Sequence, residues 1–136
     1  MDIAALITWL LTAVGGFVML GMYISKGGHR AGGAETRLAP GLVFGHFALA
    51  AIGLVVWIIY VIAGGEALAW TAFVLLLPVA LLGFTMFARW LSSRKASTVE
   101  ANFPLMVVLG HGLFAATTLV LVLLTALGLG VDSTGD

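Results

Sequence analysis

The chain alternates between long apolar stretches and short polar segments. Four stretches, residues 3–24, 41–63, 68–91 and 103–129, consist mainly of hydrophobic side chains and glycine. Each reaches the roughly 20 residues that a helix needs to cross about 30 Å of hydrocarbon. Because backbone groups in lipid must form hydrogen bonds within their own segment, this pattern predicts four membrane-spanning helices rather than strands.

The composition indicates the same class of protein. Hydrophobic residues make up 62% of the 136 residues and charged residues only 9%, whereas a soluble domain carries roughly 25% charged residues. The net charge is zero, so the chain offers no basic field for nucleic acid. It also contains no cysteine, which excludes disulfides, iron–sulfur clusters and thiolate metal sites. The expected surroundings are therefore a lipid bilayer.

The basic residues predict an orientation in that bilayer. All of them lie in or beside residues 26–40 and 92–102, and they are Lys26, Arg30, Arg37, Arg89, Arg94 and Lys95. The two ends of the chain and residues 64–67 carry acidic residues but no lysine or arginine. Since cytoplasmic loops are enriched in lysine and arginine, both basic segments are expected in the cytoplasm and both termini outside. We expect the membrane to be a bacterial inner or plasma membrane.

An internal repeat relates the two halves of the chain. Residues 13–25 align with residues 80–92, and residues 35–55 align with residues 100–120 without a gap. The identical pairs include Gly16 with Gly83, Glu35 with Glu100, and His46 with His111. The chain is therefore predicted to contain two copies of one helical hairpin.

The repeat predicts how the helices are arranged. Repeat 1 covers residues 1–63 and repeat 2 covers residues 68–130, followed by a polar tail at residues 131–136. Both copies cross the membrane in the same direction, so an axis along the membrane normal would relate them. We expect an all-α membrane protein, a single four-helix transmembrane bundle in which the first and third helices are diagonal partners, as are the second and fourth.

His46 and His111 are the candidates for chemistry. Each lies about two turns inside its predicted span, at the matching position of the repeat. An ionisable side chain at this depth is costly to bury without a partner, so by default it indicates function. Imidazole is also the commonest metal ligand. We therefore predict that the two rings face each other across the bundle and bind one metal-containing group that lies between them.

Small residues are expected to leave a flat gap around this pair. Some lie four and seven positions beyond each histidine, and the others are glycines at similar depth on the first and third helices. These predicted cofactor-binding residues are Gly16, Gly83, Ala50, Gly53, Ala115 and Thr118. Haem fits such a gap, because a six-coordinate iron takes its axial ligands from opposite faces of the macrocycle.

The placement of His46, His111, Gly16 and Gly83 resembles the four-helix haem core of membrane b-type cytochromes, the cytochrome b and b561-like proteins. In those proteins the ligating histidines lie on the second and fourth helices, with glycines on the first and third. The resemblance implies a bound haem b near the cytoplasmic side, and electron transfer to or from a quinone or a partner complex. Those proteins usually carry two histidines per ligating helix and two haems, whereas this chain supports at most one.

Two other interpretations of the histidine pair stay open. The side chains can instead hydrogen-bond across the bundle, to Thr117, Thr118 or a backbone carbonyl, in a non-catalytic accessory subunit of a larger respiratory or transport complex. They can also titrate in a small proton-coupled carrier. Because almost no mass lies outside the membrane, we expect a homo-oligomer or a subunit of a larger membrane complex in every case. No residue is assigned a catalytic role, and the pattern does not decide whether the protein is an enzyme.

The repeat also pairs two acidic residues in the basic segments. Glu35 and Glu100 occupy matching positions, a few residues before the second and fourth spans. We expect both to be solvated loop residues, or first-turn charges that favour a helix N-terminus.

Overall fold

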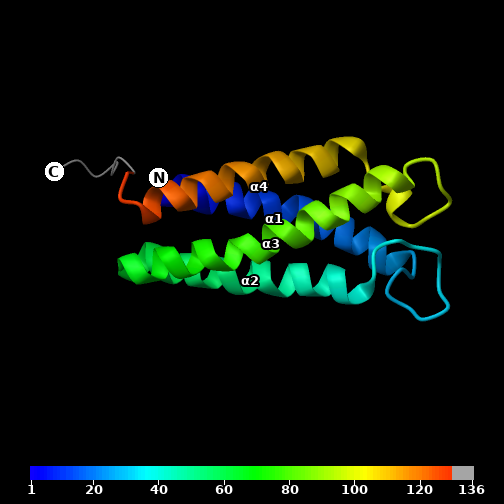
Figure 1. Ribbon diagram of the computed structural model, residues 1–136, viewed down its shortest axis with the longest axis horizontal. Coiled ribbons are helices and arrows are strands. Elements are labelled where there is room, and N and C mark those ends of the chain that lie inside the picture. The colour runs from blue at the N-terminus through cyan, green and yellow to red at the C-terminus, as the bar shows by residue number, and fades with distance from the viewer. Residues whose placement is uncertain (130–136) are drawn as a thin grey trace.

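A computed structural model describes residues 1–129 as a bundle of four long helices (Figure 1). The helices are α1 (Asp2–Ser25), α2 (Pro40–Ala63), α3 (Glu66–Ser93) and α4 (Leu105–Ala126), and a short 3-10 helix, η1 (Glu100–Asn102), precedes α4. Within residues 1–129 there is no strand, so the predicted all-α class is confirmed. The last residue of repeat 2 and the polar tail at 131–136 lie outside the described residues.

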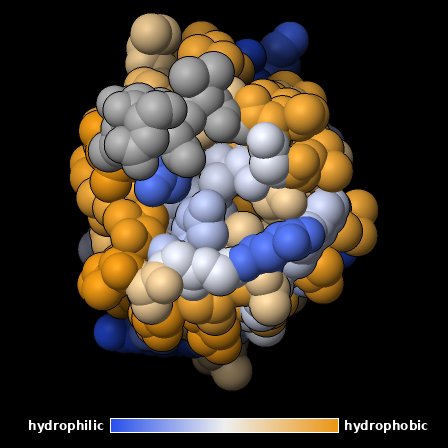
Figure 2. Space-filling view, turned by 90° about the vertical axis from the view of Figure 1, so that its left-hand side faces the viewer, coloured by the Kyte–Doolittle hydropathy of each residue, from blue (hydrophilic) through white to orange (hydrophobic). Residues whose placement is uncertain are grey.

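All four helices are long and apolar enough to cross a membrane. Their outward-facing side chains are apolar, and exposure reaches 81% at Ile62, 78% at Met106 and 71% at Phe84. Figure 2 shows the bundle from one end, where hydrophobic residues form the outer wall and the hydrophilic colours gather on the end face. An apolar wall of this extent suits lipid and would be a liability in water.

The connections divide between the two ends of the bundle (Figure 1). The terminal end holds the N-terminus, the turn at residues 64–65 and the end of α4. The loop end holds the two longer connections, residues 26–39 and 94–104. Gly64 and Gly65 form the tight turn with φ values of 71° and 104°, a backbone region that glycine enters without steric cost. Both basic segments therefore share the loop end.

The helices pack as two pairs. α1 packs mainly against α4, and α2 mainly against α3, while α3–α4 and α1–α2 contacts close the bundle. Contacts between α1 and α3, or between α2 and α4, are few. These last two combinations are therefore the diagonal ones, and the helices that carry His46 and His111 lie on opposite corners of the bundle.

Two clusters of buried side chains hold the bundle together. The cluster in the terminal half is built around Trp9 and Trp57, and the fully buried Trp57 donates its indole N–H to the carbonyl of Asp2 at 3.1 Å. The cluster at the loop end contains Tyr23, Leu38, Trp90, Val99, Phe103 and Val108. On α2, side chains that pack on the two clusters flank the position of His46, which therefore lies between them.

Candidate functional site

His46 and His111 face each other across the interior of the bundle. Their ring centroids are 6.3 Å apart and their ring planes are inclined by 61°. Both side chains are partly buried. Because α2 and α4 are diagonal partners, the two rings meet only by pointing inward from opposite corners, at the same height along the bundle. This is the placement expected from their matching positions in the sequence.

Each ring is held by one hydrogen bond to a neighbouring helix. Nδ1 of His46 lies 2.9 Å from the carbonyl oxygen of Val79 on α3, and Nδ1 of His111 lies 2.7 Å from the carbonyl oxygen of Thr12 on α1. A carbonyl oxygen only accepts, so Nδ1 carries the proton and donates it in both rings. In the neutral imidazole this leaves the lone pair on Nε2, the atom that is then free to bind a metal.

Glycines provide the space for the two rings. A Cβ atom added at Gly16 would lie 3.2 Å from Cε1 of His111, and one added at Gly83 would lie 3.3 Å from Cε1 of His46. Contacts this short require the neighbouring ring to shift by a few tenths of an ångström, so the two glycines let the histidine rings lie close to α1 and α3. The proximity of these two glycines to the histidines is therefore an observed feature of the site.

Gly15 is a third close neighbour, which sequence reasoning missed. A Cβ atom there would lie 3.3 Å from Cβ of His111. In the alignment of residues 13–25 with residues 80–92, Leu82 stands opposite Gly15, so that alignment carried no signal for this position. The adjacent glycines on α1 were the only available indication, because two consecutive small residues allow a neighbouring helix to approach closely.

The surroundings of the two histidines match each other closely. Each ring bonds to a helix of the other hairpin, and each acceptor residue precedes its glycine by four positions: Thr12 before Gly16, and Val79 before Gly83. Each histidine therefore donates to a backbone carbonyl that lies about one helical turn before the glycine touched by its ring. The two binding environments are equivalent in kind, although the acceptor side chains differ.

Gly53, predicted to line a cofactor, lies against an indole ring instead. A Cβ atom at Gly53 would lie 3.1 Å from two ring carbons of Trp9. Gly53 is itself buried. The space beside it is therefore filled by protein, and the missing side chain serves the packing of α1 on α2.

The other three predicted lining residues also lie toward the terminal half. Thr118 is buried, and its hydroxyl donates to Oγ1 of Thr8 at 2.9 Å, which links α4 to α1. Ala50 is partly buried and packs against the terminal cluster, and Ala115 is partly buried on α4. Of the six predicted lining residues, only the glycines Gly16 and Gly83 are placed against the histidine rings.

Glu100 is completely buried at the loop end, so the expectation of a solvated side chain is wrong for this residue. Its carboxylate accepts hydrogen bonds from the Thr36 hydroxyl at 2.7 Å, the Arg37 backbone N–H at 2.8 Å and the Ser93 hydroxyl at 3.0 Å. Burial by itself raises a carboxyl pKa, but these donors outweigh it and hold the pKa of Glu100 below its ordinary value. Its counterpart Glu35 is exposed, which is why the repeat did not reveal this role.

The Glu100 network joins the segments that lead into α2 and α4. Thr36 and Arg37 lie just before α2, whereas Glu100 begins η1, just before α4. The backbone N–H of Val99 adds a hydrogen bond of 3.0 Å to the carbonyl of Glu35. The network therefore ties together the segments that lead into the two helices that carry His46 and His111.

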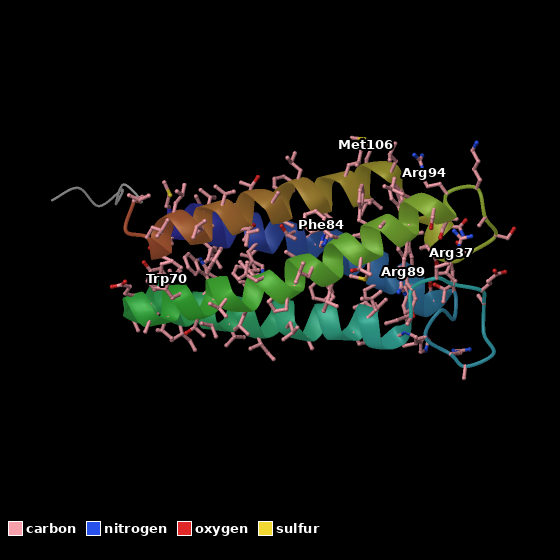
Figure 3. All side chains as sticks on the ribbon, viewed as in Figure 1. Arg37, Trp70, Phe84, Arg89, Arg94 and Met106 are labelled. Carbon is pink, nitrogen blue, oxygen red and sulfur yellow. The ribbon has the colours of Figure 1, made fainter. Side chains whose placement is uncertain are left out.

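Three arginines gather at the same end of the bundle (Figure 3). Arg89 donates to the backbone carbonyl of Arg37 at 3.0 Å, and Arg37 donates to the backbone carbonyl of Ser92 at 2.6 Å. Within residues 1–129 neither these two nor Arg94 forms a salt bridge. The loop end therefore carries an excess of positive charge beyond the histidine level.

Searches for known relatives were negative. No protein family, curated protein or solved structure matches this chain. The described residues also hold no group of three or more His, Asp or Glu side chains that could bind a metal ion. A haem iron requires only two ligands from the protein, because the porphyrin supplies the other four.

Proposed function

We propose that this protein is a small integral membrane cytochrome of the b type, with His46 and His111 as the axial ligands of one haem b. The observation that carries the proposal is the facing pair of imidazoles with free Nε2 atoms. Histidines that bind metals almost always donate their other ring N–H to a carbonyl, carboxylate or water. The Val79 and Thr12 carbonyls supply such acceptors.

The spacing of the rings supports bis-histidine ligation. Metal–imidazole bonds are about 2.0 Å long, so two axial imidazoles, with the radius of each ring included, have their centres roughly 6 Å apart. The separation here is 6.3 Å. His46 on α2 and His111 on α4 would hold the group between the α2–α3 pair and the α1–α4 pair, where contacts between helices are fewer.

The histidines of this bundle could ligate one such group and no more. Toward the terminal end, Trp9 and Trp57 occupy the core. The remaining histidine, His29, lies in the first connection. A single haem would therefore lie in the loop-end half, where Gly16 and Gly83 flank the ligands.

The haem would supply one-electron oxidation and reduction. The residues of this chain would supply ligation, ring orientation through the two carbonyls, and an apolar shell that controls the reduction potential. We propose that electrons pass to or from a quinone or a partner complex. The small mass outside the helices supports assembly with such a partner or with further copies of the chain.

The proposed topology places the loop end in the cytoplasm and the termini outside, in a bacterial inner or plasma membrane. The apolar outer wall supports insertion, and the positive-inside rule supports the orientation because every lysine and arginine lies at or near the loop end. The matched environments of the two histidines support a tandem repeat of one hairpin about an axis along the bundle.

A visible absorption spectrum of the purified protein tests the proposal. With sufficient haem supply we expect a sharp reduced band, lost in His46→Ala and in His111→Ala because each removes one axial ligand. His29→Ala is the matched control and should keep the band. A colourless wild-type protein obtained with adequate haem supply would rule out the cytochrome.

One observation favours a second candidate, in which the histidines only join helices in an accessory subunit. Each ring already makes an interhelical hydrogen bond through Nδ1. Asparagine can replace that donor without supplying an Nε2 ligand. In a cytochrome, the double variant His46→Asn and His111→Asn folds but loses haem; in an accessory subunit, it assembles with its partners as the wild type does.

A further inference from the structure

An open groove at the loop end lies apart from the histidine pair. Its volume is about 630 Å³, within the range of roughly 300–1,000 Å³ that is typical of small-molecule sites. The end of α1, the end of α3 and both longer connections contribute to its walls. The residues that matter for its chemistry are Lys26, Arg94, Ser97 and Thr98.

The groove carries positive charge without an acidic partner. Lys26 caps the end of α1 and Arg94 caps the end of α3. No aspartate or glutamate lines the groove, and neither cation forms a salt bridge in the part of the chain that the structure describes. The guanidinium of Arg94 lies 5.2 Å from the ring centre of the buried Trp90, so cation–π attraction holds this charge in place.

A second, independent feature is the side chain of Thr98. It lines the groove and is only 2% exposed, yet its hydroxyl has no hydrogen-bond partner among the described residues. Buried hydroxyls are almost always paired, and an unpaired one destabilises the fold. A hydroxyl donor, a lysine and an arginine in one groove are a combination that recognises phosphate oxygens.

We propose that this groove binds the phosphate of an anionic lipid headgroup, with Lys26 and Arg94 as the cationic partners and Thr98 as a hydrogen-bond donor. The groove lies where the apolar helices give way to the basic connections, which is the headgroup level of a spanning bundle. Anionic lipids are concentrated in the cytoplasmic leaflet. This inference rests on the proposed membrane topology and is independent of haem.

The test compares discs of phosphatidylcholine with discs that also contain phosphatidylglycerol. We expect phosphatidylglycerol to raise the midpoint of thermal unfolding, and Lys26→Gln or Arg94→Gln to remove most of that rise. Arg30→Gln and Lys95→Gln, exposed cations of the same connections outside the groove, are the matched controls. An equal loss in all four variants would overturn the site in favour of a diffuse charge effect.

Thr98→Val separates binding from mere packing. Valine has nearly the same shape and removes the unpaired hydroxyl, so unfolding in phosphatidylcholine alone should occur at an equal or higher temperature. The rise caused by phosphatidylglycerol should shrink at the same time. A variant that is stabilised and responds fully to phosphatidylglycerol would overturn the role of Thr98.

Inorganic phosphate, added to the protein in detergent, distinguishes the source of the phosphate group. Stabilisation at millimolar phosphate, lost in Arg94→Gln, would assign the groove to a soluble anion and overturn the lipid. Failure of the proposed membrane insertion has a different signature, because the protein would then not enter discs of either composition.

Discussion

The loop-end half and the terminal half of this bundle are built from the same four helices, but their interiors differ in kind. In the terminal half two tryptophans and small apolar side chains fill the space. In the loop-end half two histidines, backbone carbonyls and a buried carboxylate occupy it. A buried polar group must be paired to be tolerated, so directed hydrogen bonds add to the apolar cluster of the loop-end half, whereas shape dominates the packing of the terminal half.

Two glycines show what this difference means for a single residue type. Gly53 and Gly83 both lie inside helices and both were predicted to line a cofactor. Gly53 accommodates the Trp9 ring, whereas Gly83 accommodates the ring of His46. The same absence of a side chain supports packing in one half and a candidate ligand site in the other.

The largest expected effect is on the packing of the terminal half. Trp57→Ala should lower the free energy of unfolding by about 3–5 kcal/mol, because it removes a large, fully buried side chain and leaves a cavity. Unfolding in detergent measures this loss, with Trp57→Phe as the milder control. The absorption band expected of the proposed haem site should stay unchanged in the folded fraction; a shifted band would show that the two halves are not separable.

In the loop-end half we expect a smaller effect on the free energy of unfolding and a larger effect on ligand binding. Gly83→Val should cost about 1–3 kcal/mol through overpacking and lower haem affinity at least tenfold, because the added side chain displaces the His46 ring. Haem titration measures the affinity. Gly112→Ala, at a glycine with open space around it, is the control and should bind haem normally. Equal binding by both variants would contradict the role given to Gly83.

Glu100→Gln tests the hydrogen-bond network that joins the segments leading into α2 and α4. We expect a loss of about 1–3 kcal/mol, since hydrogen bonds to a charged acceptor are replaced by weaker ones to an amide. The pKa of Glu100 is lowered in the folded state from its ordinary value of 4.5, so its contribution is present above that pH and disappears as the pH falls through the lowered pKa.

The measurement is thermal unfolding as a function of pH. The wild type should lose stability on acidification below about pH 4.5, and Glu100→Gln should lose less over the same range. Glu35→Gln, which changes an exposed counterpart, should follow the wild type. Parallel curves for all three proteins would show that Glu100 does not stabilise the loop end as a charged group.

The smallest expected effect concerns the hydrogen bond between the hydroxyls of Thr118 and Thr8, which joins α4 to α1 in the terminal half. Thr118→Val removes the hydrogen bond to Thr8 and should lower the free energy of unfolding by about 0.6 kcal/mol, the typical value for such bonds in membranes. Thr117→Val, which removes only a bond to the carbonyl of Leu113 in the same helix, is the control. A much larger loss would show that the terminal half also depends on directed polar contacts.

Periodicity and repetition predicted the helices and the histidine pair well. The four predicted stretches differ from the observed helices by only a few residues at each end. The agreement is good because clusters of polar residues and glycines mark the ends of the apolar stretches. The pairing of His46 with His111 was predicted by the repeat, since equal positions on diagonal helices must lie at equal heights.

The neighbours of the histidines were harder to predict. Gly15 was missed and Gly53 is covered by Trp9, because the face that a helix position presents depends on the rotation of its neighbours. Glu100 was expected in solvent or in the first turn of a helix, and it begins η1. Its burial was missed, because a carboxylate in a basic connection has the same sequence signature whether it is exposed or surrounded by donors. Its burial depends on Thr36 and Ser93, which are distant in sequence and close only in the fold.

The amino-acid sequence by itself determined four apolar helices, a loop end that collects every basic connection, and two histidines at equivalent positions. These follow from the hydrophobic pattern and from the direction in which each helix must run. Only the tertiary structure decided that the two rings point at each other, which nitrogen of each ring is free, and which glycines touch them. Those properties depend on how helices rotate and approach one another, which side-chain packing between distant segments determines.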